Sequence, residues 1–529
     1  MRPHSTALFT RTTRLIAGVL LCVTCLSSFS APAGTPSLNL EQAIVLTLAQ
    51  DAYIQLGREQ TEFARGVTQS ASGQFDAALD TGIEQSVAHV PRSQLDFVQS
   101  PPQYNDEPEL ITQDTLARLR VRKQFRSGIT VSPGVNVTRY RDNLEQDNAV
   151  NRANVSFLIR FPLMRGRGVE STGAAEKAAK IEEQAAHLNL QQVIAQRILN
   201  TTTAFWWSLA AQQQVDVLRS SEAQSSNLVT AVSDVVKIDE VAPSELRQAE
   251  ADLAARTAAR IAGEQTYWAA RQQLARSIGM PVEEMPSPPV PVGPFPEATV
   301  PKSLGPNNAA MLTQSLERRA DYLAGIRLRE ASEVLERAAT RDLQPRLDLD
   351  LEVGYAALEE GNRLNDFYGS LHPGLAAGPN ALGRLSLEWP FLNRSARGLL
   401  TQRQASRRQS EIQLQELARS IYAGILTARE ELLAARGELE QSEIAADKFR
   451  VATASEMQKV QLGTASILDV ITLTDRLNNA QITTISARAR YLIALARLRY
   501  ETGWLLAQSQ SADQSVSLED LTTLPNWND

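Results

Sequence analysis

Residues 470–503 read VITLTDRLNNAQITTISARARYLIALARLRYETG. Mostly apolar side chains recur in this stretch at alternating steps of three and four, which is the spacing of a helix packed as a coiled coil. The positions of this seam are Leu473, Leu477, Ala480, Thr484, Ala487, Tyr491, Ala494 and Leu498. A second seam lies beside it and consists of Ile482, Ile485, Ala489, Leu492 and Ala496. A helix with two neighbouring seams packs on two partners, so the stretch predicts a sheet or cylinder of helices.

The same pattern occurs earlier in the chain, which indicates an internal repeat. At a constant offset of 224 residues, Leu246, Leu253, Tyr267, Ala270, Leu274 and Gly279 match Val470, Leu477, Tyr491, Ala494, Leu498 and Gly503. Each half reads as a short helix, strands, a long helix, a turn and a helix. We therefore expect a first repeat over residues 34–280, a Pro-rich linker over 281–306, a second repeat over 307–505 and a polar C-terminal tail over 506–529.

The predicted helices are unusually long. Residues 168–238 contain no proline, and about 70 helical residues would extend about 105 Å. The two shorter helical segments of the first half, residues 38–72 and 244–278, have about 35 residues each, so end to end they match the long one. This match predicts a rod in which one long helix lies beside two short ones.

The strands show a second pattern, in which apolar and polar residues alternate. In RLDLDLEVGY, residues 346–355, every second side chain is apolar, and residues 129–137, 154–161 and 384–389 alternate in the same way. Such segments occur in transmembrane β-barrels and also in soluble half-buried sheets. Their connection to long helical rods favours the barrel, and one half has too few strands to close it without other chains.

The N-terminus has the zones of a secretory signal. Three arginines precede an apolar run from Leu15 to Leu26, and Ala31-Pro32-Ala33 follows it. We expect residues 1–33 to be removed as a signal peptide, and both cysteines, Cys22 and Cys25, to leave with it. Losing three arginines and no acid changes the formal charge from −7 to −10, which argues against a nucleic-acid partner. The apolar run is too short to span a membrane as a helix.

Several motifs together make the chain resemble the TolC-type outer-membrane efflux proteins, also called outer-membrane factors. These motifs are Leu38-Asn39-Leu40-Glu41-Gln42-Ala43, Phe161-Pro162-Leu163-Met164-Arg165-Gly166, its copy Trp389-Pro390-Phe391, and the turn LGTASILDV at residues 462–470. The resemblance covers nearly all of the mature chain.

The resemblance implies a mainly α protein with β structure. It implies a homotrimeric outer-membrane β-barrel with about four strands per chain, continued into a long periplasmic α-helical barrel. It also implies a passive exit channel of a tripartite efflux or type I secretion system, which docks a periplasmic adaptor protein and an inner-membrane pump. No enzymatic activity, cofactor or metal is implied. Residues 76–161 are about 40 residues longer than their counterpart in the second half, and the surplus could be a further hairpin, an external loop or a plug.

The resemblance also assigns residues at the ends of the paired helices. Asp469 and its counterpart Glu245 are the candidates for an acidic tip aperture, which would favour cations. Alternatively, both are first-turn acids favoured by the helix dipole. The candidate adaptor-docking positions at the hairpin tips are Asp239, Pro243, Gly463, Ser466 and Val470.

At the strand-to-helix junctions, Pro162 and Pro390 can each occupy the first turn of a helix, where a missing N–H costs nothing. A functional alternative for the whole chain is a non-transporting trimeric coiled-coil scaffold of the envelope. The duplicated strand blocks favour the channel, because a stalk has no need of them.

Overall fold

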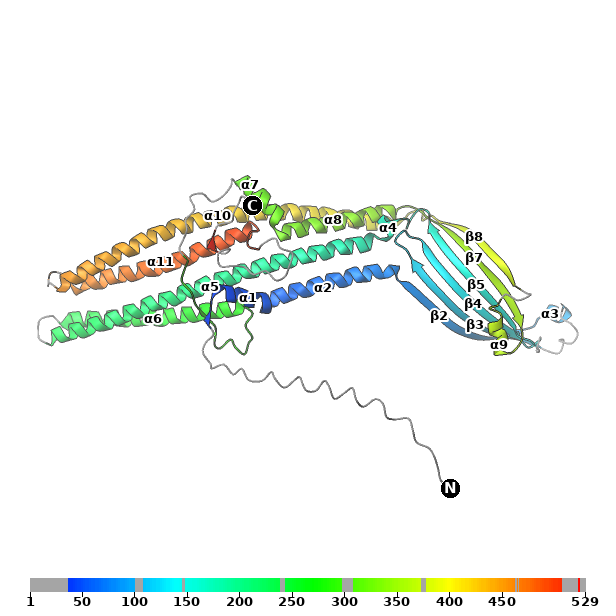
Figure 1. Ribbon diagram of the computed structural model, residues 1–529, viewed down its shortest axis with the longest axis horizontal. Helices are drawn as coiled ribbons and strands as arrows, with labels where there is room; N and C mark the ends of the chain where they lie inside the picture. The colour runs from blue at the N-terminus through cyan, green and yellow to red at the C-terminus, as the bar shows by residue number, and fades with distance from the viewer. Residues whose placement is uncertain are drawn as a thin grey trace, which may run out of the picture.

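The computed structural model describes residues 37–99, 108–144, 148–237, 243–296, 308–372, 377–461, 464, 466–506 and 522–523. A rod of nearly parallel helices joins, at one end, a curved antiparallel sheet (Figure 1). The predicted signal peptide lies outside the described residues, as do Asp239 and Gly463. Among the helices that are described, none is both long and apolar enough to cross a membrane.

The rod consists of two sets of helices. The first set is α1 (Leu40–Gln50), α2 (Ala52–Ser72), α5 (Ala174–Val236) and α6 (Pro243–Ser277), and the second is α7 (Asn308–Arg318), α8 (Ala320–Arg341), α10 (Arg394–Gln461) and α11 (Ile467–Glu501). Shorter elements are the 3₁₀ turn η1 (Gly73–Phe75), α3 (Gln94–Gln99), α4 (Val169–Thr172) and α9 (Leu364–Gly369). At 1.5 Å per residue, the 68 residues of α10 extend about 100 Å.

Two short helices stack beside each long one, as the sequence predicts. Both α2 and α6 pack along α5, and both α8 and α11 pack along α10. The lengths agree, because α2 and α6 have 21 and 35 residues against 63 in α5. The bounds of α6 and α11 differ by 224 residues at both ends, since Pro243 corresponds to Ile467 and Ser277 to Glu501.

The helix predicted over residues 38–72 is interrupted at Asp51, contrary to expectation. Asp51 has extended backbone angles, and its carboxylate accepts hydrogen bonds from the backbone of Tyr53 and Ile54, which caps α2. The same carboxylate, only 2% exposed, pairs with Arg197 of α5 at 2.7 Å. A buried acid satisfied in this way fixes the break between α1 and α2, whereas an unbroken helix would leave it without these backbone donors.

A glycine ends each stacked helix at the corresponding place. Gly279 and Gly503 both have φ of +75°, the left-handed conformation that ends helices. The next residue in each case bonds back across the last turn, Met280 N–H to Ala275 O at 3.0 Å and Trp504 N–H to Arg499 O at 2.8 Å. A side chain on Gly279 would lie 2.6 Å from the carbonyl oxygen of Gln50. Gly279 therefore lets α6 end directly against the break between α1 and α2.

The core of the rod is rich in alanine, with a few large side chains. Trp206 is 2% exposed, contacts Phe205 edge-on at 5.2 Å and stacks on Phe295 at 5.7 Å. Phe295 belongs to the predicted linker, and Arg271 of α6 donates to the carbonyl of Pro289 in the same segment at 3.1 Å. Residues around 288–296 are thus packed against the helices.

The sheet has six strands, in the order β2-β3-β4-β5-β7-β8. Their bounds are β2 Ala77–Pro91, β3 Glu109–Gln124, β4 Thr130–Asp142, β5 Val150–Pro162, β7 Arg346–Glu360 and β8 Ala377–Glu388. The expectation of about four strands per chain is therefore wrong. The surplus of residues 76–161 forms a further hairpin, β2–β3, in which all fifteen residues of β2 pair with β3. A separate short parallel pair joins β1 (Ser37–Leu38) to β6 (Val290–Pro291).

Candidate functional site

The six-stranded sheet has one polar and one apolar face, because its register aligns side chains of the same kind. One row across all six strands consists of Asp80, Arg120, Gly134, Ser156, Gly354 and Asn380. The next row points to the opposite face and consists of Thr81, Leu119, Val135, Val155, Tyr355 and Pro379. The alternation seen in single segments of the sequence is thus in phase across the whole sheet.

The apolar face is largely uncovered. Its exposed large side chains include Leu79, Ile83, Val87, Leu119, Phe157, Val353, Leu385 and Leu387. Ile83 alone is 81% exposed. Soluble monomers rarely leave a continuous apolar surface of this kind, whereas lipid-facing sheets present one. Toward the loop end, Ala153 and Ala357 are buried where α9 packs on β5 and β7.

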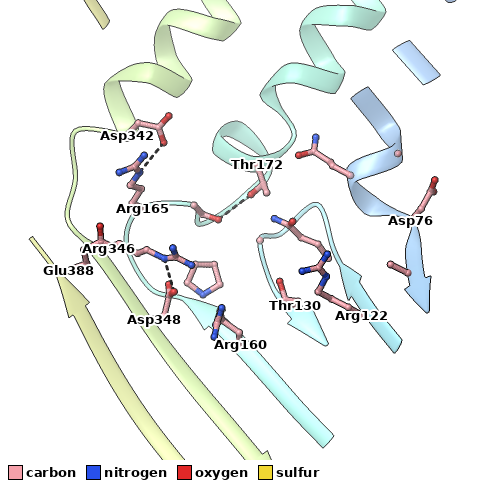
Figure 2. Close-up of a pocket in the computed structure, with 17 residues that line it drawn as sticks. Asp76, Arg122, Thr130, Arg160, Arg165, Thr172, Asp342, Arg346, Asp348 and Glu388 are labelled. Carbon is pink, nitrogen blue, oxygen red and sulfur yellow. Dashed lines mark hydrogen bonds and ion pairs between the residues drawn. The ribbon is translucent and has the colours of Figure 1, made fainter. Parts of the chain in front are cut away.

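The polar face of the sheet borders a cavity. A cavity of about 750 Å³ lies between the base of the sheet and the helices, and every strand contributes to its wall (Figure 2). One lining residue from each strand in order is Ala78, Arg122, Thr130, Arg160, Asp348 and Glu388. All of these side chains belong to the polar face. The curvature of the sheet therefore encloses polar groups and turns apolar groups outward.

Ion pairs fix most of the arginines at this junction. The guanidinium of Arg160 donates to Asp350 at 2.7 and 3.1 Å, and Arg346 pairs with Asp348 at 2.8 Å. Arg165 lies 3.7 Å from Asp342 at the end of α8. Asp348 and Asp350 are 5% and 6% exposed, so these pairs are held within the wall.

Pro162 and Pro390 mark the junction, although neither lies in the first turn of a helix. Pro162 is the last residue of β5, and α4 begins only at Val169. Pro390 follows β8 by two residues and precedes α10, which starts at Arg394. The prediction of a first-turn proline is wrong. Proline ends a strand here because it has no N–H to continue the hydrogen-bond ladder.

A carboxylate at the start of α5 connects three elements. Glu176, 4% exposed, accepts two hydrogen bonds from Arg126 in the β3–β4 turn, at 2.7 and 2.8 Å, and one from Lys180 at 2.7 Å. The hydrogen bonds from Arg126, followed by that from Lys180, lower the pKa of Glu176 to about 2. Arg126 also lies 4.8 Å from the ring of Phe75, the last residue of η1. The first turn of α5 is thus tied to the sheet.

The helix tips lie at the end of the rod away from the sheet (Figure 1). Asp469 is exposed in the first turn of α11, where its carboxylate accepts a 3.4 Å bond from the backbone of Ser466 and completes a capping box. Glu245 is half-buried in the first turn of α6, which begins at Pro243. Both acids therefore lie in the first turns of their helices, and Asp469 also takes part in a capping box.

Near the tips, a buried arginine joins the two helical hairpins, α5–α6 and α10–α11. The sequence alone does not single it out. Arg256 of α6 is 8% exposed and bonds to Asp252 at 2.7 Å, to Ser221 of α5 at 2.5 Å and to Asp475 of α11 at 2.9 Å. Asn478 of α11 donates to the same serine at 2.7 Å. An arginine among many on a helix carries no sequence signal of burial, because the two partners that enclose it, Ser221 and Asp475, come from other helices.

Val470, one of the candidate adaptor-docking positions, is buried between the two hairpins and is not exposed at the tip. Val470 is 6% exposed and lines a cavity of about 330 Å³ between the hairpins, together with Arg256 and Met457. Its side chain points between the hairpins of one chain. Ser466 and Asp469 are exposed at the tip.

Comparison with known proteins supports this architecture. No family model and no curated protein matches the sequence. Several solved structures match nearly the whole chain, among them the outer-membrane channel CmeC of Campylobacter jejuni, with a TM-score of 0.64 and 12% identity over 93% of this chain and 90% of that one. The outer-membrane protein VceC of Vibrio cholerae gives 0.60 and 15% over 88% and 96%. The open-state MtrE channel of Neisseria gonorrhoeae gives 0.59 and 12% over 88% of each chain.

These likenesses show that the chain has the fold of outer-membrane channels of the TolC type. The resemblance drawn from the sequence motifs is confirmed at the level of the fold.

Proposed function

We propose that this protein is a passive outer-membrane exit channel, in which three copies enclose one pore. The observation that carries the proposal is the six-stranded sheet with its hollow polar face and exposed apolar face, joined to a rod about 100 Å long. Lipid against the apolar face and water against the polar face would satisfy both surfaces. The rod would then extend the passage through the periplasm, and the protein would act as a duct and not as an enzyme.

Closure of the barrel by several copies follows from the edges of the sheet. Strands β2 and β8 are the two edges of the sheet and are exposed along their whole lengths, so in the part of the chain that is described each has one side without a paired strand. An antiparallel sheet with an even number of strands has edges that run in opposite directions, so β8 of one copy can pair with β2 of the next in the same antiparallel pattern. Three copies with six strands each would supply eighteen strands.

The helix tips are the proposed sites of closure and docking. Asp469 and Glu245 from three chains would bring six carboxylates to the end of the tunnel, where they would attract cations. The exposed tip residues, with Ser466 at their centre, are the proposed contact for a periplasmic adaptor, which would connect the duct to an inner-membrane pump. The combined machine would export small molecules or polypeptides.

The first test is localisation and conductance of the purified protein. We expect a heat-modifiable oligomer in the outer-membrane fraction that conducts ions in planar lipid bilayers. A soluble periplasmic monomer without conductance would contradict the channel and favour the scaffold.

A matched pair of variants tests which face meets lipid. Ile83→Arg places a charge on the apolar face, whereas Ser86→Arg places the same charge on the polar face of the same strand. A lipid-facing arginine costs about 2–4 kcal/mol near the bilayer midplane, so Ile83→Arg should prevent membrane assembly and Ser86→Arg should not. Equal assembly of both variants would contradict the assignment of the faces.

A further inference from the structure

The short helix α9, between β7 and β8, packs on the sheet at the end away from the rod (Figure 1). Val137, Ala153 and Ala357 are aligned in one row of the apolar face and are all buried. Their neighbours on the polar face, Asn154 and Ala356, are exposed. The helix therefore covers the apolar face, on the side away from the cavity.

Hydrogen bonds tie both ends of the α9 segment to this face. Before the helix, the guanidinium of Arg139 donates to the carbonyl oxygen of Asn362 at 2.8 Å. After the helix, the hydroxyl of Tyr355 donates to the carbonyl oxygen of Leu371. Both donors share the face of the buried row, because each is two residues from one of its members. These bonds hold α9 against the strands and leave its outer side uncovered.

The position of α9 along the strands coincides with the end of the apolar band. Beyond Ala357, the next row of the same face consists of Arg139, Asn151 and Glu359. In the other direction, the ten steps back to Leu347 extend about 34 Å along β7, which at a strand tilt of about 40° is a height of about 26 Å. The apolar band of outer-membrane barrels is about 25 Å tall. A bilayer around the sheet would therefore end at the level of α9.

The exposed side chains of α9 suit such a boundary. Leu364 and Tyr368 are one helical turn apart, so they share a side of the helix, and they are 68% and 55% exposed. Phe367 packs edge-on against Tyr368, with ring centroids 5.5 Å apart. At the opposite end of the sheet, Trp389 and Phe391 are exposed next to β8. Aromatic residues at both ends of an apolar band form the girdles of a membrane barrel.

We propose that α9 is an interfacial membrane anchor, whose Leu364 and Tyr368 side chains insert among the lipids of the outer leaflet where acyl chains meet headgroups. This inference rests on the proposed channel function, which gives the apolar face to lipid. Tyrosine suits this depth, because its ring is apolar and its hydroxyl can bond to headgroups or water. Three chains would carry three such anchors around the barrel.

The test measures the depth of single nitroxide labels in a lipid bilayer. Both cysteines of the chain lie in residues 1–33, so the expected mature chain has no competing thiol. Leu364→Cys and Tyr368→Cys are labelled, reconstituted in phosphatidylcholine vesicles, and exposed to oxygen, which concentrates in lipid, or to a nickel chelate, which stays in water. We expect the ratio of oxygen to nickel collisions to exceed that of a pore-facing label at least about threefold, because interfacial helices insert about 5–10 Å into the boundary between headgroups and acyl chains.

Two matched labels give the limits of the scale. Asn154→Cys places the label on the polar face at an exposed position, and Val353→Cys places it on the exposed part of the apolar face. The expected order of the ratio is Val353, then the two α9 positions, then Asn154. If Tyr368→Cys does not assemble, Leu364→Cys carries the test, because Leu364 is the more exposed of the two.

The outcomes separate the anchor from the channel. If the α9 labels resemble Asn154 while Val353 reads as lipid, the anchor is overturned and the channel stands. Labels on α9 that are shielded from both reagents would mean that protein covers the helix, which also contradicts the anchor. A label at Val353 that resembles Asn154 would overturn the lipid-facing sheet and, with it, the proposed channel.

Discussion

The stacking of short helices against long ones depends on Gly279, and replacing it with alanine should destabilise the protein strongly. Its φ of +75° is a conformation that costs a residue with a Cβ about 1–2 kcal/mol. The new methyl group would also lie 2.6 Å from the carbonyl oxygen of Gln50 and 2.9 Å from the backbone nitrogen of Asp51. Backbone at that distance has to move, and overpacking of this kind costs about 1–3 kcal/mol. Together we expect a loss of about 3 kcal/mol per chain.

Alanine substitutions at two other glycines, Gly503 and Gly66, give a series of variants whose stabilities can be ranked. Gly503 has the same φ, but its nearest neighbour would be the Cβ of Arg318 at 3.1 Å, so Gly503→Ala should cost about 1–2 kcal/mol from the backbone alone. Gly66 lies within α2, and a methyl group added there would have nothing within 4 Å. Gly66→Ala should therefore stabilise the chain by about 0.5–1 kcal/mol.

The assay is urea unfolding in detergent, followed by far-ultraviolet circular dichroism, which reports the helical rod. The expected order of the midpoints is Gly66→Ala, wild type, Gly503→Ala and Gly279→Ala, from highest to lowest. If Gly279→Ala unfolded no earlier than Gly503→Ala, the close approach of α6 to the break between α1 and α2 would be refuted. If Gly66→Ala had the lowest unfolding midpoint, the expectation that alanine stabilises this helical position relative to glycine would also be refuted.

Three further predictions concern charged groups. Because the pKa of Glu176 is lowered to about 2, its ion pair with Arg126 stabilises the fold above the ordinary value of about 4.5 and is lost as pH falls toward 2; the unfolding midpoint of wild type should therefore drop more steeply across this range than that of Glu176→Gln. Asp252→Asn leaves the buried Arg256 with one carboxylate fewer and should cost about 2 kcal/mol in urea unfolding, whereas Asp475→Asn, at a half-exposed carboxylate, should cost less than about 1 kcal/mol. Under the proposed function, Asp469→Asn with Glu245→Gln should weaken block of the bilayer current by divalent cations, and unchanged block would exclude a carboxylate aperture at the tip.

Local sequence patterns predicted the elements of the rod well. The seams of residues 470–503 and their copy at an offset of 224 correspond to α11 and α6, with 35 residues each. Such patterns are readable because burial of one helix face repeats along the chain and requires no knowledge of the partner. The break at Asp51 was missed, because the cap is local but the Arg197 partner that holds its buried carboxylate lies 146 residues away.

The candidate site was predicted less completely. The sequence placed Asp469 and Glu245 in the first turns of their helices, yet it gave no sign of Arg256, whose acidic and hydroxyl partners come from three helices. It also left open whether the surplus of residues 76–161 was a hairpin, a loop or a plug, because alternation alone does not say which strand pairs with which.

What the sequence by itself determined are the properties with a local period: long helices, strands with two unlike faces and the order of both along the chain. Only the tertiary structure decided the number of strands in the sheet, which face is hollow, and which arginines keep an acidic partner. The physical reason is that periodicity records the environment of each residue averaged over its own element, whereas register, curvature and ion pairing depend on contacts between residues far apart in the chain. Arg160 and Asp350 illustrate this, because each lies in an alternating segment of the sequence, and only the register of β5 against β7 brings the two together as an ion pair.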